Sequence, residues 1–290
     1  MHDPMLEHHQ TTLRSGAQVH YISGGPDDGI PIVLLHGGGT DHALLSWRDT
    51  LPVLVENGYR VYAPNYPGYG PSPLDTQPST TDVLIGYLEQ LMDAWQIDRT
   101  ALVGISMGAS IAIGYTLRHP ERVRGLTLIG AYGIQDDVAY HRLSYLFLNT
   151  PWLVDASWKL MRGSRWAARY SLNSIVRNPA AQTEALIDEV MVAMNNVSAQ
   201  QAFSQWQRDE VRWGWLKTNY TERLHEIAAP VLLVHGTHDA GVPLKYAQRA
   251  ATKFQDARLE VFEHAGHWTQ RDFPERFHTL LLAFLENRLT

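Results

Sequence analysis

Short apolar runs recur along the chain and alternate with longer stretches whose apolar residues follow helical spacing. The run at Ile32–Leu35 is continuous, which is typical of a strand covered on both faces. Further strands are expected at Tyr59–Ala63, Thr100–Ile105, Leu126–Ile129, Val231–Val234 and Leu259–Phe262. A β-hairpin is expected where Thr12–Arg14 and Ala17–Ser23 flank a Ser-Gly turn. The pattern predicts several neighbouring strands rather than a bundle of helices.

Helical patterns lie between these strands. The clearest runs from Thr80, a candidate N-cap, to Gln96, and its apolar residues recur every three or four positions. Other helices are expected over 43–56, 107–118, 243–254 and 274–288. Alternating strands and helices favour βαβ units, in which a parallel sheet has helices on both faces. The predicted class is therefore α/β with a mostly parallel central sheet.

The alternation stops near Ile134 and resumes with the expected strand at Val231–Val234. The block 134–218 shows amphipathic helical stretches at Ala139–Leu148, Trp152–Tyr170 and Gln182–Met194, and we expect no strand there. Six of the nine Trp of the chain fall within it. We therefore predict a core formed by residues 1–133 and 219–290, interrupted by a helical cap over 134–218.

Composition narrows the chemistry. The 290 residues include no Cys, which excludes disulfides, thiolate nucleophiles and Cys-type zinc sites. A net charge of −6 gives no overall attraction to nucleic acid or to an anionic membrane, and no apolar run is long enough to span a bilayer. No segment resembles a signal peptide. We expect a cytoplasmic protein that acts on a small molecule, with a homodimer left open.

The strongest local motif is Gly104-Ile105-Ser106-Met107-Gly108, which follows a predicted strand and opens a predicted helix. A strand-to-helix turn of the form G-x-S-x-G is strained and tight, so glycines remove side chains that would clash. Such a turn exposes the serine hydroxyl above the sheet and places it beside free N–H groups of the helix N-terminus. Ser106 is the candidate nucleophile.

A serine hydroxyl needs a base to take its proton, and the base needs an acid to orient it. His267 follows the last predicted strand, and Asp239 follows the strand at Val231–Val234. All three candidates lie at carboxyl ends of strands, where ligands bind in open α/β sheets. Their order along the chain is Ser, Asp, His, which is the order of α/β-hydrolases.

His36-Gly37-Gly38-Gly39 also ends a predicted strand. Glycine leaves backbone N–H groups unobstructed, so we assign the oxyanion hole to the amides of Gly38 and Met107. A Walker-type phosphate loop is excluded because Gly39 is followed by Thr40 and Asp41 rather than Lys-Ser/Thr. No His-Glu-x-x-His helix is present, and we expect neither a metal nor a cofactor.

These motifs resemble the α/β-hydrolase superfamily over nearly the whole chain. Within it, the glycine loop, Asn57-Gly58-Tyr59-Arg60-Val61, Ser106-Met107-Gly108 and the tail through Gly266-His267-Trp268 are most similar to meta-cleavage-product hydrolases, which cut carbon–carbon bonds. Two departures matter. That subgroup commonly has Asn where this chain has Ile105, and a cap Arg for the dienoate carboxylate at a position that falls near Val190. Gly37, Gly39, Ile105, Trp206, Trp213 and Trp268 are expected to bind substrate.

Three functions follow as hypotheses. The first is a serine hydrolase of small to medium apolar or aromatic carboxylic esters, favoured because both departures replace polar groups that would hold an acidic dienone. The alternative is a carbon–carbon hydrolase of 2-hydroxy-6-oxo-dienoates. A non-catalytic ligand receptor on the same frame is the third, and the intact triad pattern argues against it.

Overall fold

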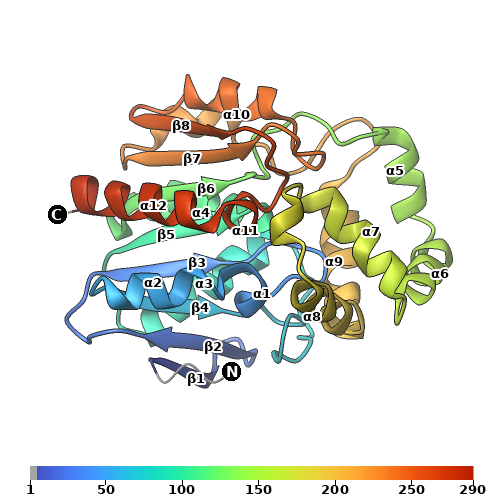
Figure 1. Cartoon of the computed structure of the whole chain (residues 1–290), viewed down its shortest axis with the longest axis horizontal. Coiled ribbons are helices and arrows are strands. Elements are labelled where there is room, and N and C mark those ends of the chain that lie inside the picture. The colour runs from blue at the N-terminus through green and yellow to red at the C-terminus, as the bar shows by residue number, and fades with distance from the viewer. Residues whose placement is uncertain (1–4, 290) are drawn as a thin grey trace.

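The computed structural model describes residues 5–289 and shows an eight-stranded sheet with helices on both faces (Figure 1). The strand order is β1-β2-β4-β3-β5-β6-β7-β8. Strand β2 pairs antiparallel with both β1 and β4, and every other neighbouring pair is parallel. The bounds are β1 Leu6–Thr12, β2 Gln18–Gly24, β3 Pro31–Leu35, β4 Arg60–Pro64, β5 Thr100–Ile105, β6 Val123–Ile129, β7 Val231–Gly236 and β8 Ala257–Phe262. The predicted α/β class is confirmed.

Seven α-helices accompany the strands within the described part of the chain. They are α1 Ala43–Trp47, α2 Thr50–Glu56, α3 Thr81–Ala94, α4 Met107–Arg118, α10 Leu244–Ala251, α11 Thr269–Asp272 and α12 Pro274–Leu289. Short 3-10 helices lie at η1 Pro120–Arg122, η2 Pro179–Ala181 and η3 Thr221–Glu226. Thr80 caps α3, as predicted, because its side chain accepts a hydrogen bond from the N–H of Val83.

Two apolar cores, one on each face, hold the sheet between the helix layers. Along β3, Ile32 and Leu34 belong to the core that contains α2 and α12, whereas Val33 and Leu35 belong to the core that contains α3 and α4. This alternation is the period of two expected for a strand, and all four side chains are fully buried. Burial on both faces explains why the sequence shows a continuous apolar run there.

Five further helices lie between β6 and β7 in the chain and pack beside one end of the sheet (Figure 1). They are α5 His141–Leu148, α6 Pro151–Met161, α7 Arg165–Ile175, α8 Glu184–Met194 and α9 Val197–Glu210. Apolar residues of α7 and α8 join one core, and those of α9 join the other. These helices thus pack on both cores, above the loops that carry the candidate residues. The cap limits of 134 and 218 stay a prediction.

Several predicted elements differ from the structure. The stretch Trp152–Tyr170 forms two helices, because Gly163 adopts φ +69° and Ser164 then caps α7 through the N–H of Ala167. The expected helix over 43–56 is likewise divided into α1 and α2. The hairpin begins earlier than predicted, at Leu6, because an edge strand tolerates the polar residues 7–10 on its exposed side.

Within residues 5–289, every helix is too short or too polar to cross a bilayer.

Candidate active site

Ser106 lies in the turn between β5 and α4 with φ 51° and ψ −116°, a conformation that non-glycine residues rarely adopt. The turn is as tight as the sequence predicted. A methyl group on Gly104 would lie 2.6 Å from the carbonyl oxygen of Gly108, and one on Gly108 would lie 2.3 Å from that of Leu35. Neither position has room for a side chain, so both glycines are required for this backbone path.

Asp239 and His267 are brought together from the ends of β7 and β8. The Nδ1–H of His267 donates to Oδ2 of Asp239 at 2.8 Å. The other carboxylate oxygen accepts from the backbone N–H groups of Gly241 and Val242, at 2.8 and 2.9 Å. The side chain of Asp239 is fully buried. This arrangement fixes the imidazole so that Nε2 is the nitrogen free to exchange a proton.

The electrostatics of the pair follow from the same contact. Burial alone would raise the pKa of Asp239, but the charge and hydrogen bond of His267 outweigh it and hold that pKa below its usual value. Burial also disfavours a charged His267, yet Asp239 raises the pKa of the imidazole above its usual value. An imidazolium formed during a reaction is therefore stabilised by a carboxylate that stays ionised.

Two residues that the sequence analysis missed support this pair. Gly130, just after β6, has φ +46°, and a methyl group there would lie 2.8 Å from Nδ1 of His267 and 3.0 Å from Oδ2 of Asp239. His235 is buried at the end of β7, where burial lowers the pKa of its imidazole. Its Nε2–H donates to the carbonyl of Val242 at 2.7 Å, which fixes the loop that carries Asp239. A glycine at a strand end was the only sequence signal.

The glycine loop after β3 faces the Ser106 turn. A methyl group on Gly37 would lie 3.7 Å from Cβ of Ser106, and one on Gly38 would lie 2.4 Å from the ring of Phe203, a cap residue on α9. Met107 is the first residue of α4, so its N–H has no acceptor within the helix. The two amides assigned to the oxyanion hole thus both border the space above Ser106.

A cavity of about 410 Å³ joins these parts between the core and the cap. Eight predicted site residues line it: Gly37, Gly38, Gly39, Ser106, Met107, Trp206, His267 and Trp268. Asp239 lies behind His267. Three lining residues have ionisable side chains: Asp41, Tyr132 and His267. The other lining residues are apolar or uncharged. Among the described residues that line the cavity there is no Lys or Arg.

Two predicted substrate-binding residues do not reach this cavity. Ile105 is fully buried within β5, where its side chain joins the apolar core instead. Trp213 is 51% exposed, because the chain leaves α9 at Glu210 and turns between the bridged residues Val211 and Leu216. Its ring packs edge-on against Tyr145 of α5. Both assignments are corrected.

The lining also includes Asp41, Trp158 and Phe203, which the sequence analysis did not select. Trp158 and Phe203 carried no signal beyond the apolar pattern of a helix. Asp41 was considered only as a residue that breaks a phosphate-loop motif. Throughout the described chain, no group of three His, Asp or Glu side chains is arranged to hold a metal ion.

The comparisons with known proteins agree with this geometry. The chain is 29% identical to a 2-hydroxymuconate semialdehyde hydrolase from Pseudomonas sp. strain CF600, over 89% of this chain and 87% of that one. It is 29% identical to a 2-hydroxy-6-oxo-6-phenylhexa-2,4-dienoate hydrolase from Comamonas testosteroni, over 93% and 92%.

Among solved structures, a meta-cleavage product hydrolase from Pseudomonas fluorescens superimposes with a TM-score of 0.80 at 27% identity, over 96% of this chain and 97% of that one. A thermophilic esterase from Thermogutta terrifontis, with a TM-score of 0.78 at 18% identity over 98% and 100%, shares the fold. The family model described as alpha/beta hydrolase fold matches residues 30–274, which include the glycine loop, the Ser106 turn and the Asp239–His267 pair. The chain is thus a hydrolase that belongs to the alpha/beta hydrolase fold family.

Proposed function

We propose that this protein is a serine hydrolase that cleaves uncharged carboxylic esters of small to medium apolar or aromatic groups. The observation that carries the proposal is the absence of Lys and Arg from the described lining of the cavity around Ser106 and His267, together with the presence of Asp41. A carboxylate next to the scissile bond would be buried there without a cation and beside an acid, which is unfavourable. An uncharged ester has no such cost.

The proposed reaction assigns one role to each of these groups. Ser106 Oγ attacks the ester carbonyl carbon while Nε2 of His267 takes the hydroxyl proton. Asp239 orients the imidazole and stabilises its positive charge. The amides of Gly38 and Met107 donate to the carbonyl oxygen as it becomes negative. His267 then gives the proton to the departing alcohol, which leaves an acyl group on Ser106.

Water completes the cycle by the same route. His267 takes a proton from a water molecule, and the resulting hydroxide adds to the acyl carbon. Collapse of the second tetrahedral intermediate releases the carboxylic acid, and the proton on His267 returns to Ser106 Oγ. No cofactor is consumed. The original Ser106 proton leaves with the alcohol, and the proton that restores the Ser106 hydroxyl comes from the water molecule.

The test is hydrolysis of p-nitrophenyl acetate, butyrate and octanoate by wild type and Ser106→Ala. We expect kcat/KM to fall by about a thousand-fold or more in the variant, because the nucleophile is lost. Ser15→Ala, at an exposed hairpin turn, is the matched control and should behave as wild type. Equal hydrolysis by wild type and Ser106→Ala would refute the proposal.

A second candidate is carbon–carbon cleavage of 2-hydroxy-6-oxo-dienoates. It is favoured by the curated relatives, whose names describe that reaction, and it uses the same cavity. Bleaching of the yellow 2-hydroxy-6-oxo-6-phenylhexa-2,4-dienoate separates the two. Turnover of this dienone that exceeds ester turnover in kcat/KM would favour the second candidate. Ester hydrolysis without bleaching would favour the first.

A further inference from the structure

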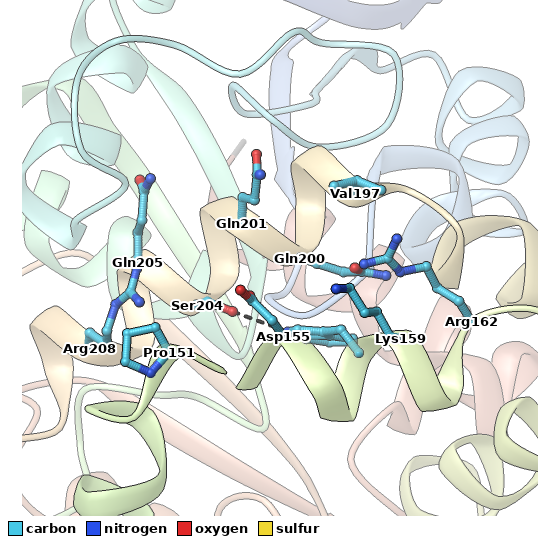
Figure 2. A pocket seen from close by; sticks show the side chains of 11 residues that line it. Pro151, Asp155, Lys159, Arg162, Val197, Gln200, Gln201, Ser204, Gln205 and Arg208 are labelled. Atoms are coloured by element: carbon cyan, nitrogen blue, oxygen red, sulfur yellow. Dashed lines mark hydrogen bonds between the residues drawn. The ribbon is translucent and has the colours of Figure 1, made fainter. Parts of the chain in front are cut away.

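A second cavity, of about 530 Å³, lies between helices α6 and α9 of the cap (Figure 2). We call it the α6–α9 groove. Residues 151, 155, 158, 159 and 162 line it from α6 and its C-cap, and residues 197, 200, 201, 204, 205 and 208 line it from α9. Both sets follow helical spacing, so each helix turns one continuous face to the groove. Ten of these side chains are labelled in Figure 2.

The two faces are polar where packed helices would normally be apolar. Facing helices gain stability mainly by burying apolar side chains, yet α9 presents Gln200, Gln201 and Gln205 to the groove. The direct tie across it is the hydrogen bond from Nε1 of Trp158 to Oγ of Ser204, at 3.1 Å. The amide side chains of α9 therefore offer the groove donors and acceptors that a polar group could use.

Three cations line the groove: Lys159, Arg162 and Arg208. Within the described chain, no carboxylate lies in ion-pair distance of any of them, and Asp155, the one acid of the groove, is also unpaired. Four other cap cations are paired: Arg165 and Arg169 with Glu184, and Arg212 and Lys217 with Asp209. The groove therefore carries the positive charges of Lys159, Arg162 and Arg208 against the single negative charge of Asp155.

Arg162 provides a second observation on the groove. Its Nε atom is buried and has no hydrogen-bond acceptor among the described residues. A buried donor without a partner is unfavourable, and an anionic acceptor would satisfy it. The guanidinium is also suited to bind carboxylate or phosphate oxygens with two parallel hydrogen bonds.

Trp158 borders both the groove and the site already described. It is the one residue that lines both the groove and the cavity around Ser106. The cavity on the Ser106 side is mostly apolar and has no Lys or Arg in its described lining, whereas the groove is polar and contains three cations. A ligand that passes Trp158 would therefore place an apolar part near Ser106 and an anionic part in the groove.

We propose that the α6–α9 groove binds an anionic group, such as a carboxylate or phosphate, at the far end of an apolar substrate chain whose ester lies at Ser106. This inference rests on the proposed ester hydrolysis and specifies its substrate as an amphiphile. Lys159, Arg162 and Arg208 bind the charge, and Trp158 packs against the chain between the two sites. The anionic group lies away from the scissile bond. It is therefore not buried in the cavity around Ser106, whose described lining has no cation to pair with it.

The first experiment compares two ester series on the full chain. One is the mono-p-nitrophenyl esters of dicarboxylic acids from succinate to sebacate, and the other is the neutral p-nitrophenyl esters with equal chain lengths. In wild type, we expect the ratio of kcat/KM, anionic over neutral, to rise with chain length until the carboxylate reaches the groove. The double variant Lys159→Gln/Arg208→Gln should lower that ratio about ten-fold at the best length.

Arg169→Gln is the matched control, because it removes one cap cation that pairs with Glu184 outside the groove. It should leave the ratio as in wild type at every length. A ratio that is unchanged in the double variant, or that falls equally in Arg169→Gln, would overturn the proposal. Neutral esters report that each variant is folded.

A second measurement separates failure of the groove from failure of the proposed function. Octyl phosphate and inorganic phosphate are titrated into wild type and the double variant by calorimetry. We expect octyl phosphate to bind wild type about ten-fold more tightly than the double variant, even if no ester is hydrolysed. Equal affinity of wild type and the double variant for octyl phosphate would overturn the anion site. Equal affinity of wild type for both phosphates would overturn the link to an apolar chain.

Discussion

The carboxylate of Asp41 accepts a 2.7 Å hydrogen bond from the backbone N–H of Gly37, within the loop that carries the oxyanion-hole candidate Gly38. The same oxygen accepts from the hydroxyl of Ser46 at 2.5 Å, and the other oxygen accepts from the N–H of His42. Asp41 thus links the end of the glycine loop to its start at Gly37. It lines the catalytic cavity, and its negative charge contributes to the raised pKa of His267.

Asp41→Asn should shift the acid limb of the pH–rate profile. His267 must be neutral to take the Ser106 proton, so activity is lost as the pH falls through the pKa of the imidazole. Removing a nearby negative charge lowers that pKa, and the acid limb of kcat/KM should therefore move to lower pH. Asp28→Asn, in an exposed loop at 25–29, is the control. A shift to higher pH in Asp41→Asn would contradict this account.

The same variant should change how stability depends on pH. Burial raises the pKa of Asp41 to about 6, so the folded state holds this proton more tightly than the unfolded state does. Wild type loses stability from this group as the pH rises from about 4 to about 6, by up to roughly 3 kcal/mol. Asn cannot titrate. Urea unfolding at pH 4.5 and 7.5 should show the variant gaining stability relative to wild type at the higher pH.

The parts of the site that the sequence predicted are those fixed by the local chain. Gly104 and Gly108 flank Ser106 in a strand-turn-helix segment. A side chain on Gly104 would meet the backbone of Gly108, and one on Gly108 would meet the backbone of Leu35 in the adjacent strand. Asp239 and His267 follow strands whose apolar runs were visible. Because parallel strands end at one edge of a sheet, their meeting could be inferred without knowing the exact register.

The missed residues depend on contacts between distant segments. Gly38 meets Phe203, and Thr81 meets Trp206, across the junction of core and cap. Helical periodicity shows that α9 has a buried face but not which loop it covers. Trp213 was selected for its residue type, and only the position of the turn after α9 shows that its ring faces Tyr145. Lateral packing of a cap is set by many weak contacts that no short motif records.

The contact between Gly38 and Phe203 predicts non-additive effects of mutation. In Gly38→Ala, the new methyl group would lie 2.4 Å from the ring, so the loop or α9 must move and kcat/KM for p-nitrophenyl butyrate should fall by about ten-fold or more. Phe203→Ala removes the obstacle. In that background, Gly38→Ala should cost several-fold less, which a double-mutant cycle measures directly.

Gly86→Ala provides the control for that cycle. Gly86 lies in α3, and a methyl group there has no neighbour within 4 Å. Replacing an unobstructed helical glycine should raise the free energy of unfolding by about 0.5–1 kcal/mol and leave ester hydrolysis unchanged. An equal cost of Gly38→Ala with and without Phe203 would show that the ring does not restrict the loop.

Glu210, at the end of α9, should be essential to the attachment of the cap. Its fully buried carboxylate accepts from Oγ1 of Thr81 on α3, at 2.5 Å, from the N–H and hydroxyl of Thr218, and from the hydroxyl of Tyr132. Glu210→Ala would leave these donors buried without an acceptor and should lower the free energy of unfolding by about 3 kcal/mol. Glu222→Gln, an exposed carboxylate paired with Lys253, should leave it nearly unchanged, because water screens an exposed ion pair.

The position of Glu210 also predicts which part of the molecule unfolds locally most often in Glu210→Ala. Trp206, one turn earlier on α9, donates from Nε1 to the same Thr81 hydroxyl at 3.0 Å. In Glu210→Ala, amide hydrogen exchange over α9 should therefore accelerate more than exchange over β3 and β5, which lie in the centre of the sheet. Uniform acceleration over both regions would mean that Glu210 stabilises the whole fold rather than the junction between α9 and α3.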